Sequence, residues 1–508
     1  MAPRRRGRRR LLWVGLAASL LVVGAVVALL VARNHREGDV SNPGVEFEQG
    51  DTQPPTATTT QTAPKGHPSD DHFEWSVYGY TKSRTHVIDF KKQLRPPFRR
   101  AWATRGDALL EFTPVLCKRS LFLLTDDGVL MKISRWTGDV LWRRPLGSLA
   151  ASSPTCSHGL VYVVLLRSGG RAGRVVALTG RNGRILWSRR LPSRAESSPL
   201  LDQGRLYFGT EDGTVYALRS RNGATRWRFH AAGAVKGALA LAHGKLYFGD
   251  YSGSVYAIRR RDGSPVWKVG AARGGAFGLG GGNFYSSPAV QYGRVYIGST
   301  NGAVYSFSER NGNLAWRKQT GNYVYASPAV GQVEGGPPTV WIGSYNGNVY
   351  ALNARTGAVR WARNLGGKIS GSASVIGDLV FVSSNNLKRT WALGANTGKQ
   401  LWRDNHGAFN PAISDGRRIY LNGAGTLYGL DPKGVRYAPH GRRPALTERQ
   451  RRFRRAKARA IAHRKARHIR YLRRTCSRLL HHHRRQALHS HHCWKFFHQD
   501  RRRRHHRG

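Results

Sequence analysis

The residue types that most often do chemistry do not form any common catalytic pattern in this chain. The Gly-rich stretch Gly270–Phe284 lacks the Lys and the following helix that a phosphate-binding loop requires. A Gly-x-Ser-x-Gly nucleophile motif is absent, and His230, His243 and His406 stand far apart, without the spacing of metal ligands. We therefore predict no catalytic residue, no cofactor-binding residue and no metal site here.

Two of the four cysteines occupy corresponding places in neighbouring segments. Cys117 and Cys156 follow Pro114 and Pro154 by three and two residues. A disulfide between them is expected if this region faces an oxidising compartment. Two buried free thiols are the alternative, because the sequence does not give the distance between the two Cα atoms.

The C-terminal region, residues 433–508, has a composition of its own. It is rich in Arg and His, and we interpret it as a disordered low-complexity tail that can become helical on a polyanion such as nucleic acid. His481–His483, His491, His492 and Cys493 could chelate a transition metal. A solvated basic tail explains the same composition without a metal.

The charge of the whole chain favours polyanionic neighbours. Its 508 residues include 83 Lys and Arg but only 28 Asp and Glu, which gives a formal net charge of +55. Such a surplus attracts nucleic acid, anionic lipid or an anionic envelope polymer, and it does not decide the fold.

The N-terminal segment has the features of a membrane anchor. Six Arg in residues 1–10 precede an uninterrupted apolar run at residues 11–32, long enough as a helix to cross the hydrocarbon core. A cleaved signal peptide is the alternative, although its apolar region is typically only about 7–15 residues long. The basic residues predict a cytoplasmic N-terminus with the rest of the chain outside. Residues 33–72, rich in Pro and Thr, are predicted to be an extended linker.

The central part of the chain repeats one unit. "GTVYALRSRNGATRW" at Gly213–Trp227 returns as "GSVYAIRRRDGSPVW" at Gly253–Trp267. Alternating apolar residues predict short antiparallel strands, and the Gly-containing turns join them. The Trp recurs every 40 to 49 residues, at Trp102, Trp142, Trp187, Trp227, Trp267, Trp316, Trp361 and Trp402. Four strands in a period of this length are the signature of a β-propeller blade.

The number of units predicts how the ring closes. Seven complete units end at Trp142 through Trp402, and two fragments remain. Asn410–Pro432 supplies three strands without a Trp strand, and Pro96–Thr104 supplies a Trp strand alone. We predict an all-β, eight-bladed propeller at residues 73–432, whose eighth blade joins both fragments and removes the open edge. Seven blades with two loose ends are the alternative.

The repeated "VYAL…TG…W" resembles the pyrroloquinoline-quinone-type propeller repeat, over roughly Trp75–Pro432. Trp75–Val87 is also similar to the segment that precedes such propellers. The family includes quinoprotein dehydrogenases and non-catalytic members, among them the propeller lipoprotein of bacterial outer-membrane assembly. The resemblance implies for the dehydrogenases an adjacent Cys-Cys pair and an acidic calcium site. No two cysteines are adjacent here, which argues against a bound quinone.

One departure from the family repeat predicts an interaction surface. Family repeats usually carry Asp directly after "YAL", where Arg219 and Arg259 stand in two successive units. Together with Arg221, Arg260 and Arg261, they are predicted to form one positive patch on a rim of the propeller. General solubility is the alternative explanation of these charges.

Three functions agree with these observations to different degrees. First is a membrane-tethered, extracytoplasmic scaffold for protein interaction or envelope assembly, with a protein or an anionic envelope polymer as partner. Second is a quinone-dependent dehydrogenase, which would require the missing cofactor residues. Third is a polyanion-binding module that acts through the basic tail.

Overall fold

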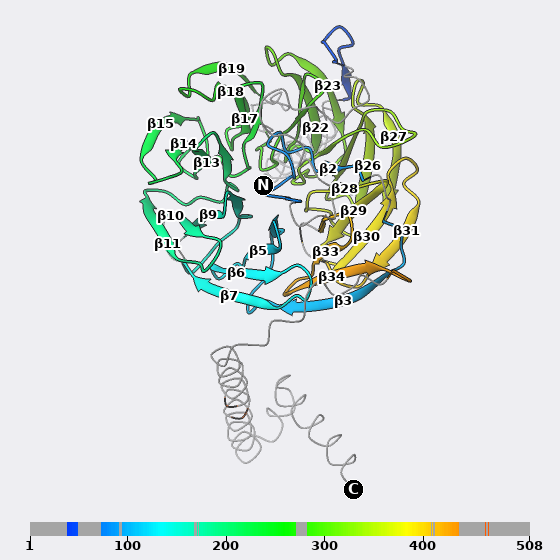
Figure 1. The fold of residues 1–508 in the computed structure, drawn as a ribbon. Coiled ribbons are helices and arrows are strands. Elements are labelled where there is room, and N and C mark those ends of the chain that lie inside the picture. The colour runs from blue at the N-terminus through cyan, green and yellow to red at the C-terminus, as the bar shows by residue number, and fades with distance from the viewer. Residues whose placement is uncertain are drawn as a thin grey trace, which may run out of the picture. The chain divides into compact units, whose positions relative to one another are not determined.

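The computed structural model describes residues 38–48, 73–90, 94–166, 170, 172–270, 282–407, 409, 412–435, 463 and 466. Within these ranges the strands form eight sheets, which stand as blades around one axis (Figure 1). The predicted all-β propeller of eight four-stranded blades is thereby confirmed. The predicted membrane segment 11–32 lies outside the described residues. Among the residues that are described, no helix is long and apolar enough to cross a lipid bilayer.

In blades 1 to 7, four consecutive antiparallel strands run from the axis outward. Blades 1 to 4 contain β4 (Val115–Cys117), β5 (Ser120–Leu124), β6 (Val129–Ser134), β7 (Val140–Pro145); β8 (Thr155–Ser157), β9 (Leu160–Leu166), β10 (Gly173–Thr179), β11 (Ile185–Leu191); β12 (Leu200–Asp202), β13 (Arg205–Gly209), β14 (Thr214–Arg219), β15 (Thr225–His230); and β16 (Ala240–Ala242), β17 (Lys245–Gly249), β18 (Ser254–Arg259), β19 (Pro265–Gly270). Blades 5 to 7 contain β20 (Ala289–Gln291), β21 (Arg294–Gly298), β22 (Ala303–Ser308), β23 (Leu314–Gln319); β24 (Ala329–Gly331), β25 (Thr339–Gly343), β26 (Asn348–Asn353), β27 (Val359–Asn364); and β28 (Ser374–Ile376), β29 (Leu379–Ser384), β30 (Arg389–Gly394), β31 (Gln400–Asp404).

Blade 8 joins the two ends of the propeller. It contains β32 (Ala412–Ser414), β33 (Ile419–Asn422), β34 (Thr426–Pro432) and, as its outermost strand, β3 (Phe98–Arg105). In the β3–β34 pair, Trp102 lies opposite Gly429 and Ala103 opposite Tyr428. The predicted closure of the ring by the two fragments is confirmed.

The repeated Trp links each blade to the next. It lies in the outermost strand. In seven of the eight blades its indole N–H donates to a backbone carbonyl at the last turn of the following blade, for example Trp187 to Ser220 at 2.8 Å and Trp316 to Ala354 at 2.9 Å. The turn Gly makes room for the ring. Gly263 has φ +77°, and a Cβ added there would lie 2.7 Å from the Trp227 ring. The Trp and the Gly therefore recur together because they form one contact between blades.

The alternation of strands gives the propeller two faces. Turns between the first and second strands and between the third and fourth strands lie on one side, which we call the turn face; Gly204 and Gly223 belong to it. Turns between the second and third strands lie on the other side with the connections between blades, which we call the connection face; Gly213 belongs to it. The backbone bonds agree, since Ser220 donates to Gly204 at 2.9 Å and Ala231 to Gly213 at 2.9 Å.

Part of the segment predicted as a free linker is docked on the propeller. Residues 38–48 include β1 (Val40–Ser41), which adds a fifth strand to the outer edge of β23, with Ser41 opposite Trp316. Phe47 stacks on Tyr292 with ring centroids 5.3 Å apart. The sequence did not predict this strand, because β1 pairs over only two residues and lies in a polar segment.

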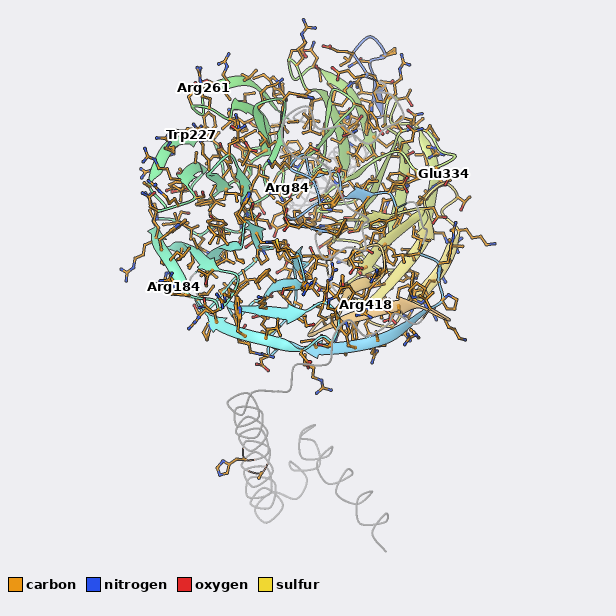
Figure 2. All side chains as sticks on the ribbon, in the orientation of Figure 1. Arg84, Arg184, Trp227, Arg261, Glu334 and Arg418 are labelled. Atoms are coloured by element: carbon orange, nitrogen blue, oxygen red, sulfur yellow. A yellow bond between two sulfur atoms is a disulfide. The ribbon has the colours of Figure 1, made fainter. Side chains whose placement is uncertain are left out.

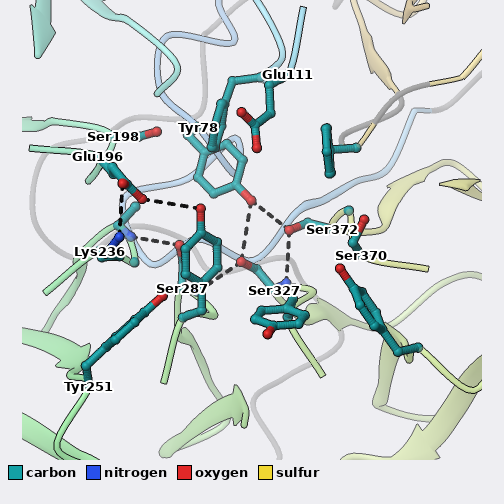
Figure 3. Close-up of a pocket in the computed structure, with 18 residues that line it drawn as sticks. Tyr78, Glu111, Glu196, Ser198, Lys236, Tyr251, Ser287, Ser327, Ser370 and Ser372 are labelled. Carbon is teal, nitrogen blue, oxygen red and sulfur yellow. Dashed lines mark hydrogen bonds and ion pairs between the residues drawn. The ribbon is translucent and has the colours of Figure 1, made fainter. Parts of the chain in front are cut away.

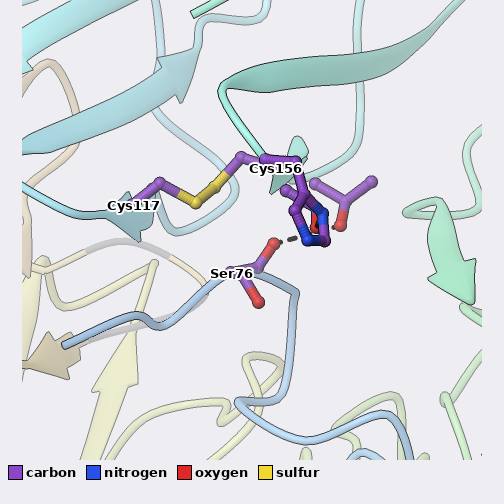
Figure 4. The surroundings of a disulfide bond; sticks show 6 residues. Ser76, Cys117 and Cys156 are labelled. Carbon is purple, nitrogen blue, oxygen red and sulfur yellow. Dashed lines mark hydrogen bonds between the residues drawn. A yellow bond between two sulfur atoms is a disulfide. The ribbon is translucent and has the colours of Figure 1, made fainter. Parts of the chain in front are cut away.

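The cysteine pair joins the innermost strands of blades 1 and 2. Cys117 at the end of β4 and Cys156 in β8 form a disulfide, with Cα atoms 6.4 Å apart (Figure 4). Ser76 lies beside it, and its carbonyl accepts hydrogen bonds from the Cys156 N–H at 2.9 Å and the Thr155 hydroxyl at 3.0 Å. Of the two alternatives that the sequence left open, the structure contains the disulfide.

Candidate binding site at the propeller axis

A segment at the start of the propeller fills its axis. Residues 73–90, which we call the plug, bond to the innermost strands of successive blades. Trp75 exchanges two backbone hydrogen bonds with Leu116 of β4, at 2.8 and 2.9 Å. At the other end of the plug, β2 (Val87–Ile88) pairs in parallel with β28. The plug pairs with the second and third residues of these innermost strands. The first residues, which lie toward the connection face, are therefore not covered by it.

Arg84 holds the plug in place from its centre (Figure 2). Its side chain is fully buried, with 0% exposure. The guanidinium donates to the carbonyls of Leu239 at 2.9 Å and Ser198 at 3.1 Å, and to that of Tyr78. Burial lowers the pKa of Arg84 to about 9, so it remains a cation at neutral pH. Burial, and then the charge of Arg84, lowers the pKa of His86 to about 3.

A belt of serines surrounds the end of the plug that lies toward the connection face. The Ser hydroxyl oxygen directly before the start of an innermost strand accepts the backbone N–H from the preceding blade, for example Ser327 from Ser287 at 3.0 Å and Ser372 from Ser327 at 2.9 Å. The Tyr78 hydroxyl joins this belt at Ser372, 2.7 Å away. The recurring "SP" of the repeat is the sequence signal for this belt.

A cavity of about 220 Å³ opens above the plug on the connection face (Figure 3). Six blades each contribute the residue that lies four positions before the first residue of their innermost strand. These residues are Glu111, Glu196, Lys236, Tyr285, Tyr325 and Ser370. Tyr251 and Tyr345 join them from turns between second and third strands. We call this cavity the axial pocket; sequence reasoning missed it because its residues lie about 40 or more positions apart.

Two carboxylates, Glu111 and Glu196, line the axial pocket. Burial, and then the charges of Asp126 and Glu196, raise the pKa of Glu111 to about 7. Burial also raises the pKa of Asp126 to about 6. Lys236 lies 3.0 Å from both Glu196 and Glu211. Even so, burial and the hydrogen bond with Glu211 raise the pKa of Glu196. The lining cation is therefore shared by carboxylates that still repel one another.

Tyrosines also line the axial pocket. Tyr325 lies 4.9 Å from Tyr345 and 5.7 Å from both Tyr285 and Tyr323, measured between ring centroids. Tyr323 is 50% exposed and stands at the outside of this group. Burial, and then the charge of Glu196, raise the pKa of Tyr285 and that of Tyr251. The hydroxyls thus remain protonated at neutral pH.

The predicted positive patch lies on the opposite, turn face. Arg219 and Arg221 border the last turn of blade 3, and Arg259–Arg261 border that of blade 4. Arg260 is half-buried and forms an ion pair with Asp202. Arg261 is exposed and pairs only with its neighbour Asp262, at 3.2 Å. The patch itself stays a prediction, now reduced to four exposed arginines.

The three central histidines make local contacts. His230 bonds to the Thr214 hydroxyl at 3.2 Å, His243 to Glu309 at 2.7 Å and His406 to Asp404 at 2.5 Å. In the described ranges, no three His, Cys, Asp or Glu side chains gather as metal ligands would. Most of the Gly-rich stretch and almost all of the C-terminal tail lie outside those ranges, so the predicted tail interactions stay predictions.

The axial pocket does not fit the quinone after which the repeat is named. Pyrroloquinoline quinone carries three carboxylates, and the pocket would face them with Glu111 and Glu196. Its lining cation, Lys236, is already paired with two carboxylates. Tyr78 and Arg84 fill the axis directly below. An anionic cofactor would therefore meet like charge and no space along the axis.

Solved structures with the same fold include a BamB protein and dehydrogenases. BamB from Moraxella catarrhalis is 19% identical, with 68% of this chain and 100% of that chain covered and a TM-score of 0.55. Quinohemoprotein alcohol dehydrogenase from Comamonas testosteroni is 14% identical, with 73% and 82% covered and a TM-score of 0.59. A europium-containing methanol dehydrogenase is 12% identical, with 72% and 99% covered and a TM-score of 0.61. Identities this low show the fold alone.

The family is shown by the sequence itself. No curated protein matches the chain. The family model for outer membrane protein assembly factor BamB matches residues 165–332 and 276–436, which together span more than half of the chain. The predicted membership in the pyrroloquinoline-quinone-type repeat propellers is confirmed. With its closed ring, its plugged axis and this match, the chain belongs to the family of outer membrane protein assembly factor BamB.

Proposed function

We propose that this protein is a membrane-tethered, extracytoplasmic propeller that serves as a protein-interaction scaffold in envelope assembly. The plugged axis carries the proposal. Residues 73–90 close the ring's centre and leave a shaped pocket open at the connection face, which suits the docking of a partner at a mouth of the propeller. The description of the matching family, an outer membrane protein assembly factor, supports a role in assembly.

The disulfide supports the extracytoplasmic location. Disulfides such as Cys117–Cys156 persist in oxidising compartments and are rare in the cytosol. The apolar run 11–32 with its Arg-rich flank supports an uncleaved anchor whose N-terminus is cytoplasmic.

The docked segment 38–48 refines how the propeller meets the membrane. Only residues 33–37 separate the proposed anchor from Gly38, and they span at most about 20 Å when fully extended. Because β1 lies on the outer edge of blade 5, we propose that blade 5 stands next to the membrane. Arg310, 81% exposed in this blade, supports contact with an anionic surface. The four exposed arginines of the turn face are proposed to meet an anionic envelope polymer.

Cysteine labelling tests this topology. In a chain with Cys476 and Cys493 replaced by Ser, Thr58→Cys is expected to react with a membrane-impermeant maleimide in intact cells. The matched variant Ala2→Cys should react only after lysis, because the N-terminus is proposed to be cytoplasmic. Labelling of Thr58→Cys only after lysis would refute the extracytoplasmic location. Loss of residues 1–32 from the mature protein would refute the anchor.

A further inference from the structure

We propose that the axial pocket binds one basic side chain, best an arginine, that a protein partner inserts between the tyrosines and the carboxylates. The inference rests on the proposed scaffold function and names the chemistry by which the scaffold recognises its partner. The pocket is lined by Glu111 and Glu196 together with Tyr285, Tyr325 and Tyr345. The Tyr285 hydroxyl donates to Glu196 at 3.5 Å, so carboxylates and rings stand next to one another.

The charges around the axial pocket favour a cationic ligand. The chain has a formal net charge of +55, yet the groups that line this cavity repel one another as anions. Glu111 lies near Asp126 and Glu196, and all three carboxyls are partly buried, which weakens the screening of their charges by solvent. An arriving guanidinium would neutralise this charge and could bond to a carboxylate through two N–H groups.

The tyrosines supply the second half of a cation site. Two lysines already rest on them, with Lys236 Nζ 5.4 Å from the centroid of Tyr251 and Lys368 Nζ 5.6 Å from that of Tyr345. Cations are attracted to the faces of such rings. Lys236 adds little repulsion because Glu196 and Glu211 neutralise it, and Lys368 is exposed to solvent.

Size and position favour a side chain over a larger ligand. The cavity measures about 220 Å³, room for the end of one long side chain. Tyr78, on its floor, is bonded to Ser372 at 2.7 Å, and the plug blocks the path beyond it. A neutral sugar could stack on the tyrosines and donate hydroxyl hydrogen bonds to the carboxylates, but it would leave their negative charge uncompensated.

A peptide pair tests the proposal. Fluorescently labelled Gly-Arg-Gly amide should bind the detergent-solubilised full chain, whereas the neutral citrulline isostere should bind about tenfold more weakly or not at all. Binding should strengthen as the pH rises through about 7, because Asp126, with a pKa of about 6, and Glu111, with a pKa of about 7, then ionise. The pKa of Glu196 is also raised, so its ionisation acts in the same direction. Lys236 and Glu211 stay charged over this range, and Tyr251 and Tyr285 stay protonated.

Variants assign the effect to the pocket. Glu111→Gln should weaken binding about tenfold and reduce the pH dependence, and Tyr325→Leu should weaken it about threefold or more. Glu334→Gln, which removes the same charge from an exposed turn on the turn face, should change nothing. Melting temperatures confirm that each variant is folded.

Three results would overturn the inference: equal binding of the citrulline peptide, an unchanged affinity in Glu111→Gln, or preferential binding of a chitin oligosaccharide. Failure here with successful labelling of Thr58→Cys would leave the scaffold function in place. Peptide binding with reversed labelling would instead refute the extracytoplasmic scaffold and keep the pocket's chemistry.

Discussion

Deletion of Pro96–Thr104 is expected to abolish cooperative folding of the propeller or to convert it into oligomers. The deletion removes most of β3, which exposes the hydrogen-bonding edge of β34. It also removes Trp102, which is only 8% exposed and whose indole bonds to the Arg135 carbonyl of blade 1 at 3.2 Å. An open sheet edge pairs readily with other chains. Thermal melting and size-exclusion chromatography with light scattering measure both outcomes.

Deletion of residues 38–48 is the matched control for that experiment. It also removes an outermost strand, but β1 pairs over only two residues, on a blade that already has four strands. We expect a folded monomer with a slightly lower melting temperature. A monomer with the wild-type melting temperature after loss of Pro96–Thr104 would contradict the closure of the ring through β3.

Replacement of Arg84 by Met is expected to lower the free energy of unfolding by about 3–6 kcal/mol. The side chain satisfies the buried carbonyls of Leu239, Ser198 and Tyr78, and each buried polar group left without a partner costs about 1–3 kcal/mol. Urea denaturation, followed by tryptophan fluorescence, measures the loss.

Arg184→Met provides the comparison for that variant. Arg184 is exposed at the turn between β10 and β11, and such surface changes usually alter stability by about 0.5 kcal/mol or less. Arg184→Met should have a free energy of unfolding within about 1 kcal/mol of the wild-type value. If Arg84→Met did so too, the plug would not depend on Arg84.

The repeat made the blades predictable, because each one carries the same local signals. The Trp, the turn Gly and the alternating apolar residues recur in unit after unit. The closure was predictable as well, since the two fragments complement each other. Contacts that depend on only a few residues were not predictable from the sequence. β1 pairs over two positions, and its polar surroundings favoured a linker.

The axial pocket was hidden because a ring places side by side residues that the sequence separates by whole units. Aligning the units on the Pro that precedes each innermost strand brings Glu111, Glu196 and Tyr325 into one column, and this column lines the pocket. Arg84 was missed for another reason. Its charge was counted with the surface surplus, whereas three carbonyls hold it in the centre of the fold. Likewise, only the fold supplies the distance that distinguishes a Cys117–Cys156 disulfide from two thiols.

Photocrosslinking from the two faces tests whether the scaffold binds a protein through its connection face. A photoreactive phenylalanine analogue replaces Tyr323, beside the axial pocket, or Arg261, on the turn face, in the membrane-anchored full chain. We expect a discrete protein adduct from position 323. Excess Gly-Arg-Gly amide and the Glu111→Gln substitution should each suppress this adduct, whereas the citrulline peptide should not. The same adduct from position 261, or an adduct at 323 that neither treatment suppresses, would contradict this expectation.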